Sequence, residues 1–278
     1  MVLKSHAKIN LSLHVNKKLK SGLHNIQSSY CLIDLSDEIS IKTNNKLKDI
    51  ILFKGPYANN LSRSNNSIQK VLNAMRKKKI ISNFYNITVN KKIPVFGGLG
   101  GGSSNAATVL KFLVKKRIKS EIINEFVNIV GSDLRLFFHK QGFLKDVKTV
   151  KKFNNKFKLD FLLVYPKIKC STEEIYSKVR NYSKKQLFVK KNHRSKTAFI
   201  HDLVNSKNDL QLIVEKKHQI IKKLLKSIRN REGCHFARMS GSGSTCYGLF
   251  LNRSCSLAAL KKLRRKYPKF WFSIAKSI

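Results

Sequence analysis

Apolar and polar residues alternate along several stretches with the period of two that is typical of a half-buried strand. In residues 9–15, four apolar side chains alternate with three polar ones, which predicts a strand with one buried face. Lys8, Asn10 and Ser12 then share the other face, and solvent-facing polarity is the simplest explanation for them. Further strands are predicted over residues 30–41, 84–89, 161–165 and 270–275.

Other stretches show the helical spacing of apolar residues. Ile68, Val71, Leu72 and Met75 are spaced i, i+3, i+4 and i+7, which predicts an amphipathic helix opened by Asn66. Further helices are predicted over residues 120–130 (ended by Gly131), 171–179, 197–204, 212–228 and 256–267. No internal repeat is visible, and the polar stretch around residues 151–157 suggests a division into residues 1–152 and 153–278.

The most distinctive stretch is residues 94–108, in which five of the six positions from Gly97 to Gly102 are glycine. Ser103 and Ser104 follow, and we expect them to cap an apolar helix. A glycine loop that leads into a helix N-terminus presents backbone N–H groups to an anion, above all to phosphate. The spacing does not fit a Walker loop, and it fits the dinucleotide fingerprint only loosely. A flexible linker would not run into a capped apolar helix.

Two further segments contain candidate chemistry. Asp133 follows Gly131 in a stretch with no other carboxylate between Glu125 and Asp146. It is either the N-cap of a short segment over residues 134–138 or a general base. Residues 236–250 contain a second loop of glycine and serine, which is either a substrate loop or a tight turn between a helix and a strand.

The composition is that of a globular protein of 278 residues with 42% hydrophobic content. No apolar run reaches the ~18–20 residues of a membrane-spanning helix, and the N-terminus does not resemble a signal peptide. The five cysteines are scattered, with no metal-binding spacing, which favours free thiols in the cytoplasm and no zinc site.

The net charge of +42, from 57 Lys+Arg against 15 Asp+Glu, is typical of nucleic-acid-binding proteins. However, the basic residues are spread over the whole chain, and lysine is accompanied by abundant asparagine and isoleucine. These three residues are encoded by A/T-rich codons. We therefore attribute the excess to drift in composition and expect neither a specific nucleic-acid partner nor a membrane partner.

Three separated motifs together are similar to the signature segments of the GHMP small-molecule kinases: residues 94–108, 131–138 and 238–250. Residues 7–11 and 22–28 narrow the resemblance to the members that phosphorylate 4-diphosphocytidyl-2-C-methyl-D-erythritol in the non-mevalonate isoprenoid pathway. The resemblance covers residues 5–275 and implies a two-domain α+β fold with the active-site cleft between the halves. It also implies ATP as phosphate donor, with Mg²⁺, and transfer to the 2-hydroxyl of the erythritol. The alternatives are another GHMP kinase and, from a different class, a basic nucleic-acid-binding module.

The resemblance also implies roles for individual residues. Asp133 matches the catalytic base, and Lys8 matches the lysine that offsets charge on the substrate hydroxyl. The matched ATP-binding residues are Pro94, Val95, Phe96, Gly97, Gly98, Leu99, Gly100, Gly101, Gly102, Ser103 and Ser104 at the phosphates, and Asn66 and Lys91 near the adenine. The matched substrate-binding residues are Asn10, Leu23, His24, Tyr176, Ser240 and Gly241. For Mg²⁺, only the hydroxyl of Ser103 or Ser104 is a plausible direct protein ligand.

The chain departs from the family pattern at three places. Leu23 stands where the family has a tyrosine that stacks on cytosine, and Arg135 stands where a proline is expected. Residues 144–148 also lack the expected glycine and glutamate. Because Lys8 and Asp133 are both retained, we expect an active kinase.

Overall fold

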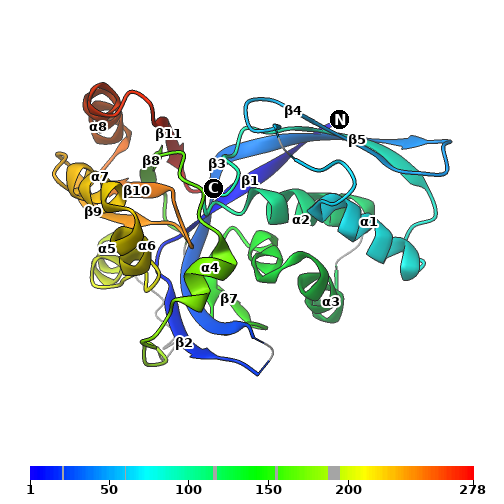
Figure 1. Cartoon of the computed structure of the whole chain (residues 1–278), viewed down its shortest axis with the longest axis horizontal. Helices are drawn as coiled ribbons and strands as arrows, with labels where there is room; N and C mark the ends of the chain where they lie inside the picture. The colour runs from blue at the N-terminus through cyan, green and yellow to red at the C-terminus, as the bar shows by residue number, and fades with distance from the viewer. Residues whose placement is uncertain (21, 60, 115–117, 154–155, 187–194) are drawn as a thin grey trace. The chain divides into compact units, whose positions relative to one another are not determined.

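The computed structural model describes residues 1–20, 22–59, 61–114, 118–153, 156–186 and 195–278 (Figure 1). By their internal contacts, these residues form two compact units. Unit 1 comprises Met1–Lys8, Leu35–Val95 and Gly100–His139, and unit 2 comprises Ile9–Asp34, Phe96–Leu99 and Lys140–Ile278. Each unit is made of several separate segments of the chain. A division by contacts therefore does not test the predicted single boundary between residues 152 and 153, and that boundary stays a prediction.

Unit 1 contains a sheet built on the long strand β3 (His24–Asn44), whose second half lies in this unit. That half pairs antiparallel with β5 (Phe84–Asn90), and β4 (Ile50–Lys54) pairs parallel with the other edge of β5. Strand β1 (Val2–Asn10) also pairs with β3. The predicted strand over residues 30–41 is therefore confirmed, although the observed strand is longer at both ends.

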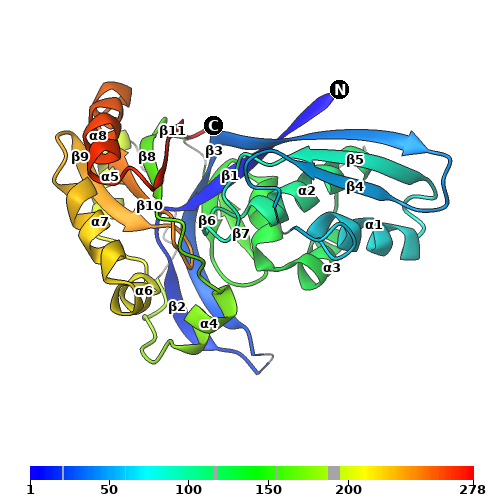
Figure 2. The ribbon, with the colours of Figure 1, turned by 45° about the horizontal axis from the view of Figure 1, so that its top comes forward.

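The helices of unit 1 are α1 (Ser67–Lys77), α2 (Gly101–Val114) and α3 (Ser120–Val130), followed by the 3₁₀ helix η1 (Ser132–Phe138). Figures 1 and 2 show α1 and α2 along one face of the sheet. Their apolar side chains form one buried cluster with those of the strands: Ile68, Leu72 and Val109 from the helices and Ile39, Ile51, Ile87 and Val89 from the sheet. The apolar spacing in the first of these helices thus marks its buried face, as predicted.

Unit 2 contains a four-stranded antiparallel sheet in the order β11-β8-β10-β9. Its strands are β8 (Asp160–Tyr165), β9 (Cys234–Met239), β10 (Cys246–Phe250) and β11 (Trp271–Lys276). Helices α7 (Gln219–Arg229) and α8 (Arg253–Lys266) pack against this sheet (Figure 2). The glycine-serine loop of residues 240–245 joins β9 to β10, so the alternative of a turn between a helix and a strand is wrong.

The first half of β3 also belongs to unit 2, where β2 (His14–Lys18) and β6 (Gln141–Leu144) both pair with it. Strand β7 (Val150–Lys152) pairs with β6. The remaining helices are α4 (Thr172–Ser177), α5 (Lys196–Val204) and α6 (Gln211–Lys217). Helices and mainly antiparallel sheets in both units agree with the predicted α+β class. None of the helices in the described part of the chain has the length and apolar character needed to span a bilayer.

Two predicted elements are wrong in detail. The strand over residues 9–15 is interrupted, because β1 ends at Asn10 and β2 begins at His14. The helix over residues 212–228 is two helices, since the non-helical backbone of His218 (φ −133°, ψ 87°) ends α6 before α7 begins. Polar side chains on the supposed outer face of the first strand are also buried: Lys8, Asn10 and Ser12 are each at most 3% exposed. They do not face solvent.

Candidate active site

The candidate catalytic pair, Lys8 and Asp133, lies within unit 1. Lys8 is in β1 and Asp133 is in η1, and the Nζ and Oδ2 atoms are 3.3 Å apart. The lysine side chain is 3% exposed and the aspartate side chain is 36% exposed. A buried ammonium group thus lies beside a carboxylate that solvent can reach. This arrangement suits a base that takes a proton from a bound molecule while a fixed positive charge stays beside the reacting oxygen.

Gly100 leaves room for the lysine side chain. Gly100 has φ +70°, and a Cβ atom there would lie 3.1 Å from Cγ of Lys8 and 2.8 Å from Cζ of Phe137. Two residues before Asp133, Gly131 ends α3 with φ +128° and is also the N-cap of η1. The alternative reading of Asp133 as that N-cap is therefore wrong, because the cap position is already taken two residues earlier.

Helix α2 begins at Gly101, so the predicted capping role of Ser103 and Ser104 is wrong and both residues lie inside the helix. Ser104 is buried, and its hydroxyl donates to the carbonyl oxygen of His6 at 2.6 Å. Because a helix leaves the N–H groups of its first turn without intrahelical acceptors, Gly101, Gly102 and Ser103 present donors to an anion. This placement fits the predicted phosphate loop.

The two residues predicted near the adenine make contacts within unit 1. The Oδ1 atom of Asn66 accepts from the backbone N–H groups of Ile68 and Gln69, each at 3.0 Å, so Asn66 caps α1 as predicted. The next residue, Ser67, donates its hydroxyl proton to the carbonyl oxygen of Gly102 at 2.7 Å and so links the starts of α1 and α2. Lys91 is buried and ion-paired with Asp37. Adenine contacts by Asn66 and Lys91 remain predictions.

The middle of the glycine stretch, Phe96–Leu99, lies in unit 2 and packs on the second glycine-serine loop. The hydroxyl of Ser240 donates to the carbonyl oxygen of Gly98 at 3.0 Å, and the N–H of Thr245 donates to the carbonyl oxygen of Gly97 at 3.2 Å. Gly98 has φ +74°, and a Cβ atom there would lie 2.2 Å from the carbonyl oxygen of Ser240. Only glycine fits this approach. Two motifs that are far apart in sequence are thus in direct contact.

Asn208 supports the second loop, and the sequence reasoning did not identify it. Its Nδ2 group donates to the carbonyl oxygens of Met239 at 2.9 Å and Gly241 at 2.8 Å. Gly241 itself has φ +57°, which suits glycine at this turn. The hydroxyl of Ser240 also accepts from the backbone N–H of Asn10 at 3.3 Å. The predicted substrate residues Asn10, Ser240 and Gly241 are therefore neighbours in unit 2.

A second group of predicted substrate residues is aromatic. The rings of His24 and Tyr176 have centroids 5.2 Å apart, and Tyr182, which the sequence reasoning missed, is stacked 6.4 Å from His24. Partial burial lowers the pKa of His24, with a smaller effect from Lys18, which favours the neutral imidazole. Leu23 is 58% exposed beside this group. A neutral ring that donates on one nitrogen and accepts on the other can read the polar edge of a base.

Known proteins are similar to this chain over nearly its whole length. Residues 66–132 match the family GHMP kinases N terminal domain, and residues 190–269 match GHMP kinases C terminal. The chain is 36% identical over 281 residues to 4-diphosphocytidyl-2-C-methyl-D-erythritol kinase of Pelagibacter ubique (strain HTCC1062), covering 99% of this chain and 98% of the relative. It is 30% identical to the enzyme of the same name from Wolbachia pipientis wMel, covering 97% and 96%. The chain belongs to the 4-diphosphocytidyl-2-C-methyl-D-erythritol kinase family of GHMP kinases.

Solved structures show the same fold. A crystal structure of 4-(cytidine 5'-diphospho)-2C-methyl-D-erythritol kinase superposes with a TM-score of 0.75 at 21% identity and covers 99% of each chain. A homoserine kinase from Cytophaga hutchinsonii superposes with a TM-score of 0.65 at 14% identity and covers 100% of this chain and 93% of its own. The two-domain α+β GHMP kinase fold expected from the motifs is confirmed.

Within this kinase family, the position of Arg135 is one of the departures that we noted. Arg135 is 6% exposed, and its Nη1 group donates to Oδ1 of Asn124 at 3.0 Å. The side chain therefore links η1, which carries Asp133, to α3. Another of the departures is residues 144–148, in which Leu144 ends β6 and Asp146 accepts from the backbone N–H groups of Lys148 and Thr149, each at 2.8 Å.

For the metal ion that accompanies ATP, the described residues contain no cluster of three or more His, Cys, Asp or Glu side chains. Of the two hydroxyl groups considered from the sequence, that of Ser104 already donates to His6. Ser103 is half-buried at the start of the same helix. The Ser103 hydroxyl therefore fits a metal ion that would be held chiefly by the phosphates of the nucleotide, as is usual for Mg²⁺.

Proposed function

We propose that this kinase transfers the γ-phosphate of ATP to the 2-hydroxyl of 4-diphosphocytidyl-2-C-methyl-D-erythritol. The observation that carries the proposal is the pair of Lys8 and Asp133, 3.3 Å apart, in a chain of this family. Phosphoryl transfer to an alcohol needs a base for the hydroxyl proton and fixed positive charge near the attacking oxygen. The two side chains supply these groups from neighbouring elements.

In this proposal, Asp133 accepts the proton of the 2-hydroxyl as the oxygen attacks the γ-phosphorus. The Lys8 ammonium stabilises the negative charge that develops on that oxygen. The first N–H groups of α2 hold the phosphate oxygens of ATP. Mg²⁺ would neutralise phosphate charge when bound, and Ser103 is the protein hydroxyl that we assign to it.

Recognition of the cytidine half is assigned to the residues of unit 2. His24 reads the polar edge of cytosine, and Tyr176 lies against its ring. Leu23 contributes apolar area but no aromatic face. Asn10 and the loop of Ser240 and Gly241 are assigned to the sugar and diphosphate side. A cytoplasmic location, where ATP is available, is part of the proposal.

The test is a coupled assay of ADP release by the purified protein with a panel of alcohols. The panel comprises 4-diphosphocytidyl-2-C-methyl-D-erythritol, homoserine, mevalonate and phosphomevalonate. We expect turnover with the cytidine substrate alone. Turnover with another alcohol in its place would support a different GHMP kinase activity. No turnover with any of them would refute the proposed function.

The catalytic pair is tested by Asp133→Asn, which should lower kcat by roughly 10²-fold or more, as expected when a general base is removed. Lys8→Ala should act similarly, because its charge is needed mainly in the transition state. ATP affinity should remain nearly unchanged in both. Glu38→Gln is the matched control, since Glu38 also pairs with a lysine, Lys92, at 2.6 Å, but on the surface. Near-normal turnover of the Asp133→Asn protein would exclude Asp133 as the base.

A further inference from the structure

Asp37 is a buried carboxylate in the middle of β3, and no role has been assigned to it so far. Its side chain is fully buried. One oxygen, Oδ1, accepts from the backbone N–H groups of Lys92 at 2.7 Å and Ile93 at 2.9 Å. The other, Oδ2, accepts from the ammonium group of Lys91 and from Nδ2 of Asn105 at 2.9 Å. Asp37 therefore connects β3 to the segment after β5 and to α2.

The chain of hydrogen bonds continues from Asn105 to β1. Asn105 donates to the hydroxyl of Ser5 at 2.9 Å. The hydroxyls of Ser5 and Ser104 are 2.8 Å apart, and Ser104 donates to the carbonyl oxygen of His6. Because the Ser104 hydroxyl donates its only proton to that carbonyl, the Ser5 hydroxyl must be the donor in its hydrogen bond with Ser104. The hydrogen bonds thus have one direction, from Asn105 through two serines to the backbone of β1.

This network, which we call the Asp37 network (Asp37, Lys91, Asn105, Ser5 and Ser104), connects the two parts of the site in unit 1. Ser104 and Asn105 belong to the first turns of α2, the helix whose N-terminus is assigned to the phosphates. Ser5 lies in β1, three residues before Lys8. A shift of α2 relative to β1 would break at least one of these buried hydrogen bonds, and a buried polar group without a partner costs about 1–3 kcal/mol.

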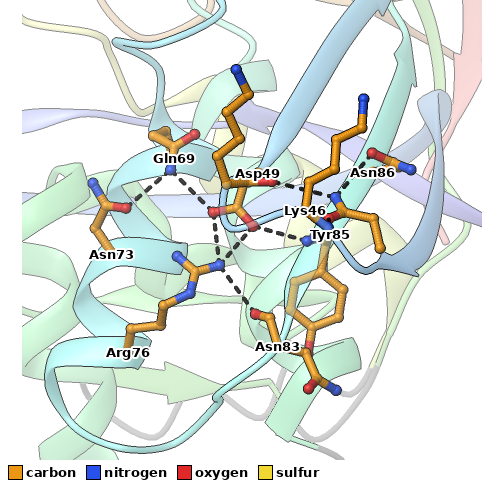
Figure 3. A network of polar contacts seen from close by, with 10 residues as sticks. Lys46, Asp49, Gln69, Asn73, Arg76, Asn83, Tyr85 and Asn86 are labelled. Atoms are coloured by element: carbon orange, nitrogen blue, oxygen red, sulfur yellow. Dashed lines mark hydrogen bonds and ion pairs between the residues drawn. The ribbon is translucent and has the colours of Figure 1, made fainter.

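A second buried carboxylate in unit 1 gives a comparison, and it is shown in Figure 3. Asp49 accepts from Nη2 of Arg76 at 2.6 Å, from Nε2 of Gln69 at 3.2 Å and from the backbone N–H of Tyr85 at 2.9 Å. Like Asp37, it binds one cation, one side-chain amide and the backbone. These contacts join α1 to β5 and include neither α2 nor β1.

Burial of the Lys91 ammonium lowers its pKa, and the charge of Asp37 acts in the opposite direction. An ion pair this deeply buried contributes little net stability, because desolvation of both charges offsets their attraction. What such a pair can supply is a fixed arrangement of the elements that carry it. The elements here are the phosphate-binding helix, by way of Asn105, and the strand of the catalytic lysine, by way of Ser5.

We propose that Asp37 is a positioning residue for ATP: through Asn105 and the two serines it holds the first turn of α2 in register with β1, so that the phosphates meet donors already in place. The proposal rests on the proposed kinase function. It makes Asp37 and Asn105 contributors to phosphate binding although neither needs to touch the nucleotide.

The test measures binding directly, with the Mg²⁺ complex of AMP-PNP and with adenosine as separate probes in calorimetry. Asn105→Ala removes the link to α2, including the hydrogen bond that Lys91 donates to Oδ1 of Asn105 at 3.1 Å, and keeps the ion pair of Asp37 and Lys91. We expect its Kd for AMP-PNP to rise roughly 10-fold or more, in the range found when supporting residues are removed. Its Kd for adenosine should change far less, because adenosine has no phosphates. Asp37→Asn should show a loss for AMP-PNP at least as large.

The matched controls are Gln69→Ala and Asp49→Asn, which remove the corresponding amide and carboxylate of the Asp49 group. They should lower the free energy of unfolding and leave both dissociation constants near those of the wild type. Equal AMP-PNP affinity in Asn105→Ala and Gln69→Ala would overturn the positioning role, as would an equal loss of adenosine and AMP-PNP binding. If Asp37→Asn does not fold, Asn105→Ala decides alone. A wild-type protein that does not bind AMP-PNP would refute the proposed function itself, and this inference with it.

Discussion

Gly100→Ala should displace Lys8, the proposed catalytic lysine, without changing any charged group. The backbone of Gly100 has φ +70°, and its Cα lies against the alkyl chain of Lys8. A Cβ atom would lie 3.1 Å from Cγ and 3.2 Å from Cε of Lys8, and 2.8 Å from Cζ of Phe137. Both neighbours are buried, but the Phe137 ring is rigid whereas the Lys8 chain has several rotatable bonds, so the lysine chain is the neighbour that gives way. We expect Nζ of Lys8 to move away from Asp133.

The size of the effect has two parts. Left-handed backbone in an L-residue costs about 1–2 kcal/mol, and the stiffer unfolded chain returns about 0.4–1 kcal/mol. The close contacts with Lys8 and Phe137 add to the loss, so the free energy of unfolding should fall by about 1–3 kcal/mol. For turnover, a misplacement of about 1 Å can cost up to about 10²-fold in rate. Gly22→Ala isolates the strain, because Gly22 has φ +81° and nothing lies within 4 Å of its added Cβ.

The assay is a double-mutant cycle in urea unfolding and in kcat, with Gly100→Ala made in the wild-type and Lys8→Ala proteins. Lys8→Ala removes the atoms that the new Cβ would strike. Gly100→Ala should therefore be less destabilising in that background and should lower kcat no further. Additive effects of the two substitutions would refute the reasoning, because they would mean that Gly100 does not act through Lys8.

Three other expectations follow from the structure. Tyr176→Ala should raise KM for the cytidine substrate about 5–150-fold and leave ATP affinity unchanged, while Leu23→Tyr should lower it; a silent Tyr176→Ala would assign Tyr176 to its helix core. Burial lowers the pKa of His14 below 6.5, so the free energy of unfolding should fall as the pH drops below 6.5. If the His14→Gln protein lost as much stability on acidification as the wild type, this prediction would be refuted. Duplex DNA should bind weakly, without sequence preference and with a steep loss on adding salt; a sequence-selective complex at physiological salt would instead support a nucleic-acid partner.

Local signals in the sequence were sufficient for much of the fold. The helix opened by Asn66 and the helix ended by Gly131 are both present, because a cap and an apolar stripe specify a helix within about a dozen residues. The helix predicted from residue 171 is also capped, since the Ser171 hydroxyl accepts from the N–H of Glu174 at 3.3 Å. The break between α6 and α7 at His218 had no such signal, because neither glycine nor proline marks it.

For the candidate site, the sequence indicated some residues and gave no sign of others. The motifs that resemble GHMP kinases indicated Lys8 and Asp133, which are 125 positions apart in sequence and 3.3 Å apart in space. Asn208, Tyr182 and Asp37 were missed, since each acts through partners that lie far away in the sequence. The start of α2 was misplaced for the same reason: the Ser104 hydroxyl bonds to β1, a contact that no local pattern can indicate.

Acidic residues are scarce in this chain, and the buried ones have a different structural role from those at the surface. With 15 acidic residues against 57 basic ones, most lysines have no carboxylate to pair with and remain solvated, and surface ion pairs contribute little stability. The buried acids behave differently. Asp37 and Asp49 each organise several elements, and Asp209 accepts from the N–H of Val15 at 2.8 Å and from the hydroxyl of Ser183 at 2.7 Å. A buried carboxylate must be paired or neutralised. Asp37 is one of three acids in β3, beside the exposed Asp34 and the surface residue Glu38, and only its side chain is buried, a difference that the sequence pattern alone does not show.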